Sequence, residues 1–184
     1  MTNPDMVLNG ELVVLRAIEI ADLEKLRLWR NRPEYQQFFR EYRNITPIMQ
    51  QNWYEKTVLA DDRVVMFAIT DKADERLLGA CGLCYIDRRN SSADFSIYLG
   101  ADDLYIDEQY APDAGKLLLE YGFSCLSLHR VWAEIYAIDT AKQHFLPSLG
   151  FQLEGRHRQA HRLENGTWTD CLFYGKLARE NKAI

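Results

Sequence analysis

The stretch Ser91-Ser92-Ala93-Asp94-Phe95-Ser96-Ile97-Tyr98-Leu99-Gly100 decides the fold of this chain, together with the acidic loop and helical pattern that follow it. From Ala93 to Leu99 polar and apolar side chains alternate, which is typical of a strand. A helix is expected to begin at Ala111-Pro112, because proline suits the first helical position and Asp113 complements the helix dipole. The residues of its expected buried stripe recur at helical spacing; they are Ala114, Leu117, Leu118, Tyr121, Cys125 and Leu128.

The loop before this helix is acidic. Asp102, Asp103, Asp107, Glu108 and Asp113 bring five acids and no Lys or Arg. A helix N-terminus at the end of a central strand normally suits an anion, because its free N–H groups point outward. These acids disfavour an anion here.

The composition limits the classes of protein to which this chain can belong. The chain has 184 residues, a formal net charge of −5 and 47% hydrophobic residues, which favours one ordinary globular domain. The negative charge disfavours a nucleic-acid partner, since phosphate backbones need a basic surface. Cys81 and Cys84 lie in an apolar strand pattern without a second pair, so we expect no zinc or other metal. The thiols fit a reducing compartment, and no signal segment or membrane-length apolar run is recognisable, so we expect a cytoplasmic protein without membrane contact.

The rest of the chain predicts one mixed sheet with inserted helices, an α/β (α+β) fold in a single domain over residues 1–184. Thr46 and Pro47 are expected to begin a helix. Asn165-Gly166 is a strong hairpin signal. The expected strands cover residues 12–15, 64–69, 77–86, 93–99 and 130–136, and two more flank that hairpin turn.

Several segments together resemble the GNAT N-acyltransferases, in the branch of the ribosomal-protein alanine N-acetyltransferases. They occur in the family's order and cover nearly the whole chain. The segments are Leu23-Glu24, Trp29 to Glu34, Gly82-Leu83, Ile86-Asp87, Asn90, Ala93-Asp94, Leu117 to Phe123, Leu128 to Val131, Leu149 to Phe151 and Glu154-Gly155.

The resemblance implies the GNAT fold, in which two central parallel strands, here 93–99 and 130–136, splay apart. The pantetheine arm of an acyl thioester would lie in the gap and pair with backbone groups of Ile97, Tyr98 and Leu99. The implied chemistry is direct acyl transfer to an amine.

One departure from the family concerns the loop that binds the pyrophosphate of CoA, whose pattern is Arg/Gln-x-x-Gly-x-Gly/Ala. Gln109 stands in place of the first glycine, followed by Tyr110 and Ala111, and the basic positions hold Asp107 and Glu108. Two repulsions of about 1 kcal/mol each would weaken CoA binding about tenfold or more. Alternatively, the acids only serve the helix dipole and solubility.

A second departure concerns the general acid. The family often places a tyrosine four residues before Gly-Phe, where this chain has Leu146, and Asp139 matches the usual asparagine. Leucine cannot donate a proton. His144 and Ser148 lie nearby and are candidate acids, although each also fits a plain helix surface.

Asp94 is the candidate general base, because it sits where family members often carry a glutamate on the central strand. Alternatively, Asp94 pairs with Arg130 or another cation across the sheet.

The candidate acceptor-binding residues are aromatic or basic. We expect an aromatic wall for the acceptor, or else a flap over the core, from Tyr35, Phe38, Phe39 and Tyr42. Arg158 and His161 on the last hairpin would bind an anionic acceptor or partner, or else form a solvated face. Trp29 and Trp132 complete the set.

These features predict an N-acyltransferase that moves an acyl group from a pantetheine thioester to a primary amine of a small molecule. The donor is acyl-CoA or acyl-phosphopantetheine on an acyl carrier protein, which would then be a partner. One alternative is an acetyl-CoA-dependent acetyltransferase of a protein N-terminus or an amino sugar. Another is a non-catalytic GNAT-shaped binding module. A homodimer stays open.

Overall fold

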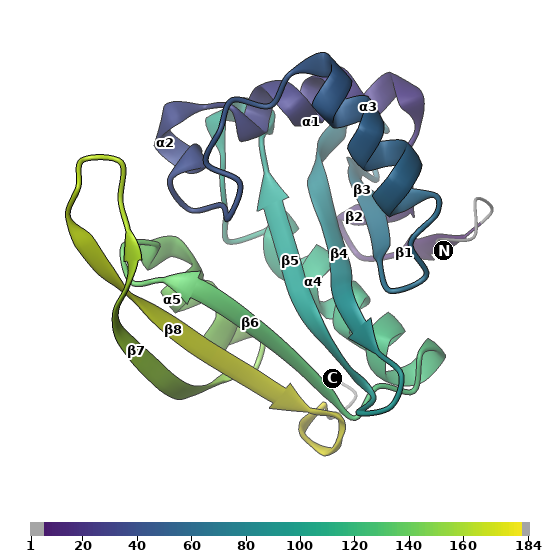
Figure 1. Ribbon diagram of the computed structural model, residues 1–184. Helices are drawn as coiled ribbons and strands as arrows, with labels where there is room; N and C mark the ends of the chain where they lie inside the picture. Colours follow the sequence, from purple (N-terminus) through teal and green to yellow (C-terminus); the bar gives the residue numbers. More distant parts are fainter. Residues whose placement is uncertain (1–5, 182–184) are drawn as a thin grey trace.

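The computed structural model of the chain describes residues 6–181, which form a mixed eight-stranded sheet with helices on both faces (Figure 1). This confirms the predicted mixed sheet. The strand order is β1-β2-β3-β4-β5-β6-β8-β7. The strands are β1 (Val7–Asn9), β2 (Val13–Ala17), β3 (Val65–Asp71), β4 (Leu77–Asp87), β5 (Ser92–Leu99), β6 (Arg130–Tyr136), β7 (Gln152–Arg162) and β8 (Trp168–Leu177).

β5 and β6 are parallel neighbours that pair over a short length. The paired positions are Ser92 with Arg130, Ala93 with Val131 and Asp94 with Trp132. Beyond Asp94, β5 continues along β4 and β6 continues along β8, so the two strands diverge (Figure 1). The predicted splay between the central strands is confirmed.

Two groups of helices cover the two faces of the sheet. α1 (Leu23–Arg30), α2 (Pro33–Gln36) and α3 (Pro47–Trp53) cover one face, and α4 (Tyr110–Glu120) and α5 (Thr140–Ser148) cover the other (Figure 1). Thr46 caps α3 by accepting the Met49 N–H at 3.2 Å, as predicted. Short helical turns complete the fold: η1 (Ile20–Asp22), η2 (Tyr54–Val58), η3 (Ala101–Asp103), η4 (Tyr121–Cys125) and η5 (Ala178–Glu180).

The alternation along β5 divides the core between these two layers. Ile97 and Leu99 pack with Leu118 of α4 and Phe145 of α5. Tyr98 points the other way and joins the cluster that contains Leu23 and Leu26 of α1.

α4 differs from its prediction at both ends. It begins at Tyr110, so Pro112 is its third residue, because the Asp107 carboxylate accepts the N–H groups of Tyr110 and Ala111 at 3.1 and 2.7 Å. At the other end η4 is a π-helix, whose extra residue per turn rotates the following side chains. Cys125 is consequently exposed and does not extend the buried stripe.

Candidate active site

A cavity of about 500 Å³ lies where β5 and β6 diverge. Its walls come from residues 94–98 of β5, residues 133–135 of β6, the end of β4, α5 and the segments around α1 and α3. A volume of this size suits a small-molecule ligand. The splay thus creates a binding site in the middle of the sheet.

Asp94 lies at the point where the strands separate, and its residue is only 5% exposed. Arg40 Nη1 lies 2.7 Å from Asp94 Oδ2, and Arg40 Nη2 lies 3.3 Å from Glu134 Oε2. Burial raises the pKa of Asp94, and the positive charge of Arg40 offsets part of that rise. Asp94 is therefore a buried carboxylate beside a cavity, and its cation is Arg40, whereas Arg130 pairs with Glu154.

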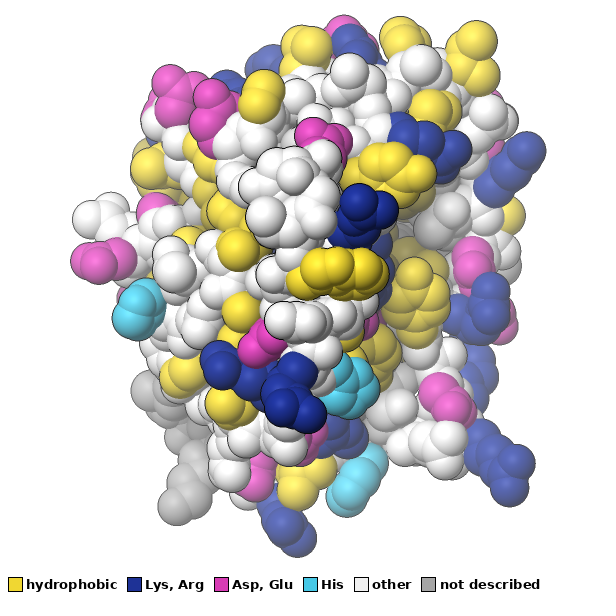
Figure 2. Space-filling view, turned by 60° about the vertical axis from the view of Figure 1, so that its left-hand side comes forward, with side chains coloured by type: hydrophobic (Ala, Val, Ile, Leu, Met, Phe, Trp, Pro, Cys, Tyr) yellow, Lys and Arg dark blue, Asp and Glu magenta, His cyan; other side chains and the backbone are white. Residues whose placement is uncertain are grey.

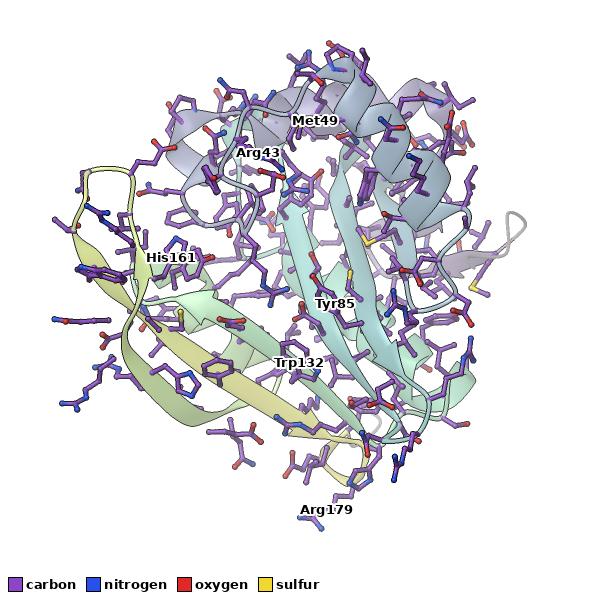
Figure 3. The ribbon with its side chains drawn as sticks, viewed as in Figure 1. Arg43, Met49, Tyr85, Trp132, His161 and Arg179 are labelled. Carbon is purple, nitrogen blue, oxygen red and sulfur yellow. The ribbon has the colours of Figure 1, made fainter. Side chains whose placement is uncertain are left out.

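Arg40 reaches Asp94 between two aromatic side chains. Its guanidinium carbon lies 5.6 Å from the Tyr85 ring centroid and 5.9 Å from that of Trp132. Figure 3 shows Tyr85 on β4 and Trp132 on β6, near the end of the sheet where β5 and β6 converge. Trp132 thus lies beside Asp94, its partner on the neighbouring strand, and is not part of the cavity lining.

The aromatic residues predicted to form a wall or a flap differ in their positions. Phe38 and Phe39 line the cavity. Tyr35 stacks on Tyr105 with ring centroids 5.1 Å apart, and Phe38 lies 5.1 Å from the same ring. Trp29 packs against Gly100. Tyr35 and Trp29 therefore lie outside the cavity lining.

The residues expected to hold the pantetheine arm follow β5. Ile97 and Tyr98 line the cavity, and burial raises the pKa of Tyr98. The Leu99 N–H donates to the Tyr105 carbonyl at 2.8 Å, so this donor is already used within the chain. Leu146 is 1% exposed and also lines the cavity, where its apolar side chain offers no proton.

The start of α4 has few free donors. Tyr110 and Ala111 donate their N–H groups to Asp107, and Pro112 has none. Gln109 is exposed just before the helix, and the Tyr110 hydroxyl donates to Asp71 at 2.9 Å. The first turn therefore offers no unbonded N–H to an external anion.

The remaining candidates lie away from the cavity lining. His144 is exposed, the Ser148 hydroxyl donates to the Phe145 carbonyl at 2.7 Å, and the buried Asp139 accepts the Tyr105 hydroxyl at 2.8 Å. On β7, Arg158 is exposed and His161 stacks on Tyr136 with centroids 3.8 Å apart. The space-filling view toward this side shows basic and histidine side chains interspersed with apolar and acidic ones (Figure 2).

Four cations of the cavity lining were missed by the sequence analysis: Arg30, Arg40, Arg63 and Lys142. Lys142 lies one helical turn before Leu146 on α5, so helical spacing from that residue could have found it. Arg30 lies four residues after the buried Leu26 on α1, so the same spacing could have found it. Arg40 gave no such signal, because it lies in an irregular segment between α2 and α3.

Cys84 is the cysteine that lines the cavity. Burial raises the pKa of its thiol to about 12, so the group stays protonated at neutral pH. A protonated thiol is a poor nucleophile. In residues 6–181 no group of three or more His, Cys, Asp or Glu side chains is arranged to hold a metal ion, and no helix there is long and apolar enough to cross a membrane.

Comparison with known proteins gives a consistent family. Residues 13–152 match the family model described as Acetyltransferase (GNAT) domain. The uncharacterized N-acetyltransferase p20 of Bacillus licheniformis is 28% identical, covering 92% of this chain and 95% of its own. The probable N-acetyltransferase YjcK of Bacillus subtilis is 27% identical over 89% of this chain and 93% of its own.

Among solved structures, a spermidine N-acetyltransferase from Vibrio cholerae, crystallised with CoA and spermine, superposes with a TM-score of 0.83. It is 22% identical, and the match covers 94% of this chain and 99% of that one. At this identity the similarity shows a shared fold, which agrees with the splayed sheet described above.

Proposed function

Because the chain belongs to the GNAT acetyltransferase family and is thereby an N-acyltransferase, we propose that it transfers an acetyl group from acetyl-CoA to the primary amine of a small molecule. The observation that carries this proposal is the buried Asp94 at the floor of the cavity between β5 and β6. The structural neighbour crystallised with CoA and spermine supports both a CoA donor and a small amine acceptor.

In the proposed reaction Asp94 removes a proton from the acceptor amine, directly or through one water. The nitrogen then attacks the thioester carbonyl, the new C–N bond forms, and the C–S bond breaks. As the amide forms, the nitrogen loses its second proton, and the leaving thiolate takes up one proton from it or from solvent. The protonated state of Cys84 favours this direct transfer over an acyl-cysteine intermediate.

The basicity of Asp94 depends on its surroundings. Burial raises its pKa, which strengthens it as a base, while the positive charge of Arg40 favours the ionised carboxylate and offsets part of that rise. Arg40 would need to share the carboxylate with the incoming amine. Glu134, 3.3 Å from Arg40 in the same cavity, gives the guanidinium an alternative partner.

We further propose that the chain lies near the ribosomal-protein alanine N-acetyltransferase branch and has an altered pyrophosphate loop. Asp107 occupies the N–H groups that would face a phosphate, and Pro112 removes another. Loss of about two charge-assisted hydrogen bonds would weaken CoA binding by about ten- to a hundredfold. This favours a second candidate donor, a pantetheine thioester on a carrier protein, which has no nucleotide.

Calorimetry tests the donor. We expect acetyl-CoA to bind. We also expect the affinity for CoA to exceed that for pantetheine by less than the nucleotide of CoA normally contributes. Binding of pantetheine without binding of CoA would favour the carrier-bound donor. Tight CoA binding, far beyond that of pantetheine, would overturn the altered-loop proposal. Failure of all three ligands to bind would favour a non-catalytic module.

Asp94→Asn tests the base. Loss of general base catalysis should lower kcat by about 10²- to 10⁴-fold, measured by thiol release with a panel of small amines, while the Kd of acetyl-CoA stays close to that of the wild type. Asp62→Asn is a matched control, because Asp62 is an exposed acid outside the cavity lining. Full activity of Asp94→Asn would remove Asp94 from this role.

A further inference from the structure

The charges that line the cavity are unequally compensated. Four carboxylates line it, and each is paired with an arginine. Asp94 and Glu134 share Arg40 at 2.7 and 3.3 Å. The other two pairs are Glu41 with Arg43 at 2.7 Å and Asp61 with Arg63 at 3.1 Å.

Two cations of the lining have no such partner. Within residues 6–181, Arg30 and Lys142 form no ion pair, and Arg30 Nε is buried without a hydrogen-bond partner. Both cations contact the same ring: Arg30 Cζ lies 4.5 Å and Lys142 Nζ lies 5.9 Å from the centroid of Phe39. Lys142 Nζ also lies 5.2 Å from the Tyr105 ring centroid.

An aromatic ring does not replace a hydrogen-bond acceptor for these groups. A buried donor left unpaired is costly, so it commonly marks a place where a ligand or water completes the site. Burial also lowers the pKa of Lys142, although Asp139 and Asp94 offset part of the effect. An anion beside Phe39 would satisfy Arg30 Nε and stabilise the ammonium form of Lys142.

The cavity therefore has two regions that prefer ligand groups of opposite charge. Around Asp94 two carboxylates share one arginine, which leaves room for a positive ammonium group. Around Phe39 neither Arg30 nor Lys142 has an ion-pair partner among residues 6–181. A polyamine would meet no unpaired carboxylate in the second region, whereas a zwitterionic molecule would match both.

We propose that the acceptor is an amine that also carries an acidic group, with Arg30 and Lys142 binding the acidic group while the amine faces Asp94. A carboxylate and a phosphate share this chemistry. The inference rests on the proposed acetyltransferase function and specifies its substrate class as amino acids or similar zwitterions.

Matched pairs of acceptors test the inference, because each pair differs only in the acidic group. Lysine is compared with 1,5-diaminopentane, ornithine with 1,4-diaminobutane, and phosphoethanolamine with ethanolamine. We expect the acidic member of a pair to have a kcat/KM about 10- to 100-fold higher, the range for a charge-assisted contact. The first two pairs report a carboxylate and the third reports a phosphate.

Variants assign the preference to the two cations. Arg30→Gln and Lys142→Gln should each reduce the preference for the acidic member about tenfold or more, with the Kd of acetyl-CoA unchanged. Lys25→Gln is the matched control, because Lys25 is an exposed cation on the same helix as Arg30. This control should keep the full preference.

Three results would overturn the inference. The first is equal or better use of the members without an acidic group, which would leave the acetyltransferase function intact. The second is a loss of acetyl-CoA affinity in Arg30→Gln without a change in acceptor preference, which would assign the cations to the donor. The third is a failure of every acidic amine to bind in calorimetry. Failure of the proposed function itself would look different, because acetyl-CoA would then neither bind nor release thiol.

Discussion

At the scale of single residues, the role of Asp94 depends on a neighbour that its own sequence context does not reveal. The family resemblance predicted a carboxylate at this position of the central strand. Arg40, which pairs with it at 2.7 Å, lies in an irregular segment between α2 and α3. Such a segment has no periodicity from which the direction of a side chain can be read.

Arg40→Gln should move the acidic limb of the pH–rate profile to higher pH. Arg40 lowers the pKa of Asp94, so its removal raises that pKa further, and the base stays protonated to a higher pH. We expect a shift of about one to three pH units in kcat/KM, measured from pH 5 to 9, with activity recovered at the alkaline end.

Arg43→Gln is the control for this shift, since Arg43 pairs with Glu41 and does not contact Asp94. Its acidic limb should stay in place. An unshifted limb in Arg40→Gln would show that Asp94 does not set the pH dependence.

At the scale of elements, the acidic loop before α4 is the place where the sequence analysis was least complete. Asp102 pairs with Arg76 at 2.6 Å, and Asp103 pairs with Arg32 at 3.0 Å. Asp113 accepts the N–H groups of residues 11–13, which fixes the start of β2 to α4. The partners of these three acids lie at least 26 residues away in the sequence, so counting charges along the loop could not find them.

Substitutions of Asp107 should change stability and CoA affinity in opposite directions. Asp107→Ala removes the acceptor for two N–H groups and should cost about 0.5–2 kcal/mol of unfolding free energy, measured by urea denaturation. It also frees those N–H groups, so the affinity for CoA should rise about tenfold relative to pantetheine.

Asp107→Asn separates the two effects, because asparagine keeps an acceptor oxygen and loses the charge. Glu108→Gln removes a nearby charge from an exposed side chain, so it should change CoA affinity less. If none of the Asp107 variants binds CoA more tightly than the wild type, the loop is not what limits nucleotide binding.

At the scale of the whole molecule, most of the sheet could be predicted because its strands carry clear apolar patterns and its central strand alternates. The mixed fold, the splay and the α3 cap were all predicted. The lining of the cavity could not be, since it combines residues from β4, β5, β6, α5 and the segments around α1 and α3. The π-helix at the end of α4 also left no local signal, and it displaced Cys125 from the core.

The unfolding free energy should be highest around neutral pH and fall on both sides. A hydrogen bond from Arg43 lowers the pKa of Glu41 to about 2, and backbone N–H groups lower the pKa of Asp71 and Asp87. These groups stabilise the fold above the pKa of the unfolded chain, about 4, and that contribution is lost as the pH falls through their lower folded values. The raised pKa of Asp94 has the opposite effect on stability, but Asp94 is one group, whereas several have lowered pKa values.

On the alkaline side, burial raises the pKa of Cys84 to about 12, so the unfolded chain loses this proton first. Stability should therefore decline above about pH 9. Thermal unfolding from pH 2 to 11 checks both limbs, and Glu41→Gln should flatten part of the acidic one. A melting temperature that rose on acidification to pH 3 would contradict the assignment.

The brief pairing of β5 with β6 has a consequence for the order of events in catalysis. It leaves two sub-sheets, β1 to β5 and β6 with β8 and β7, joined by few interstrand hydrogen bonds. A donor arm that bonds to β5 in the splay would lengthen this junction, so donor occupancy and the rigidity of the acceptor site would increase together. We therefore expect ordered substrate binding, in which the thioester binds first and the amine binds second.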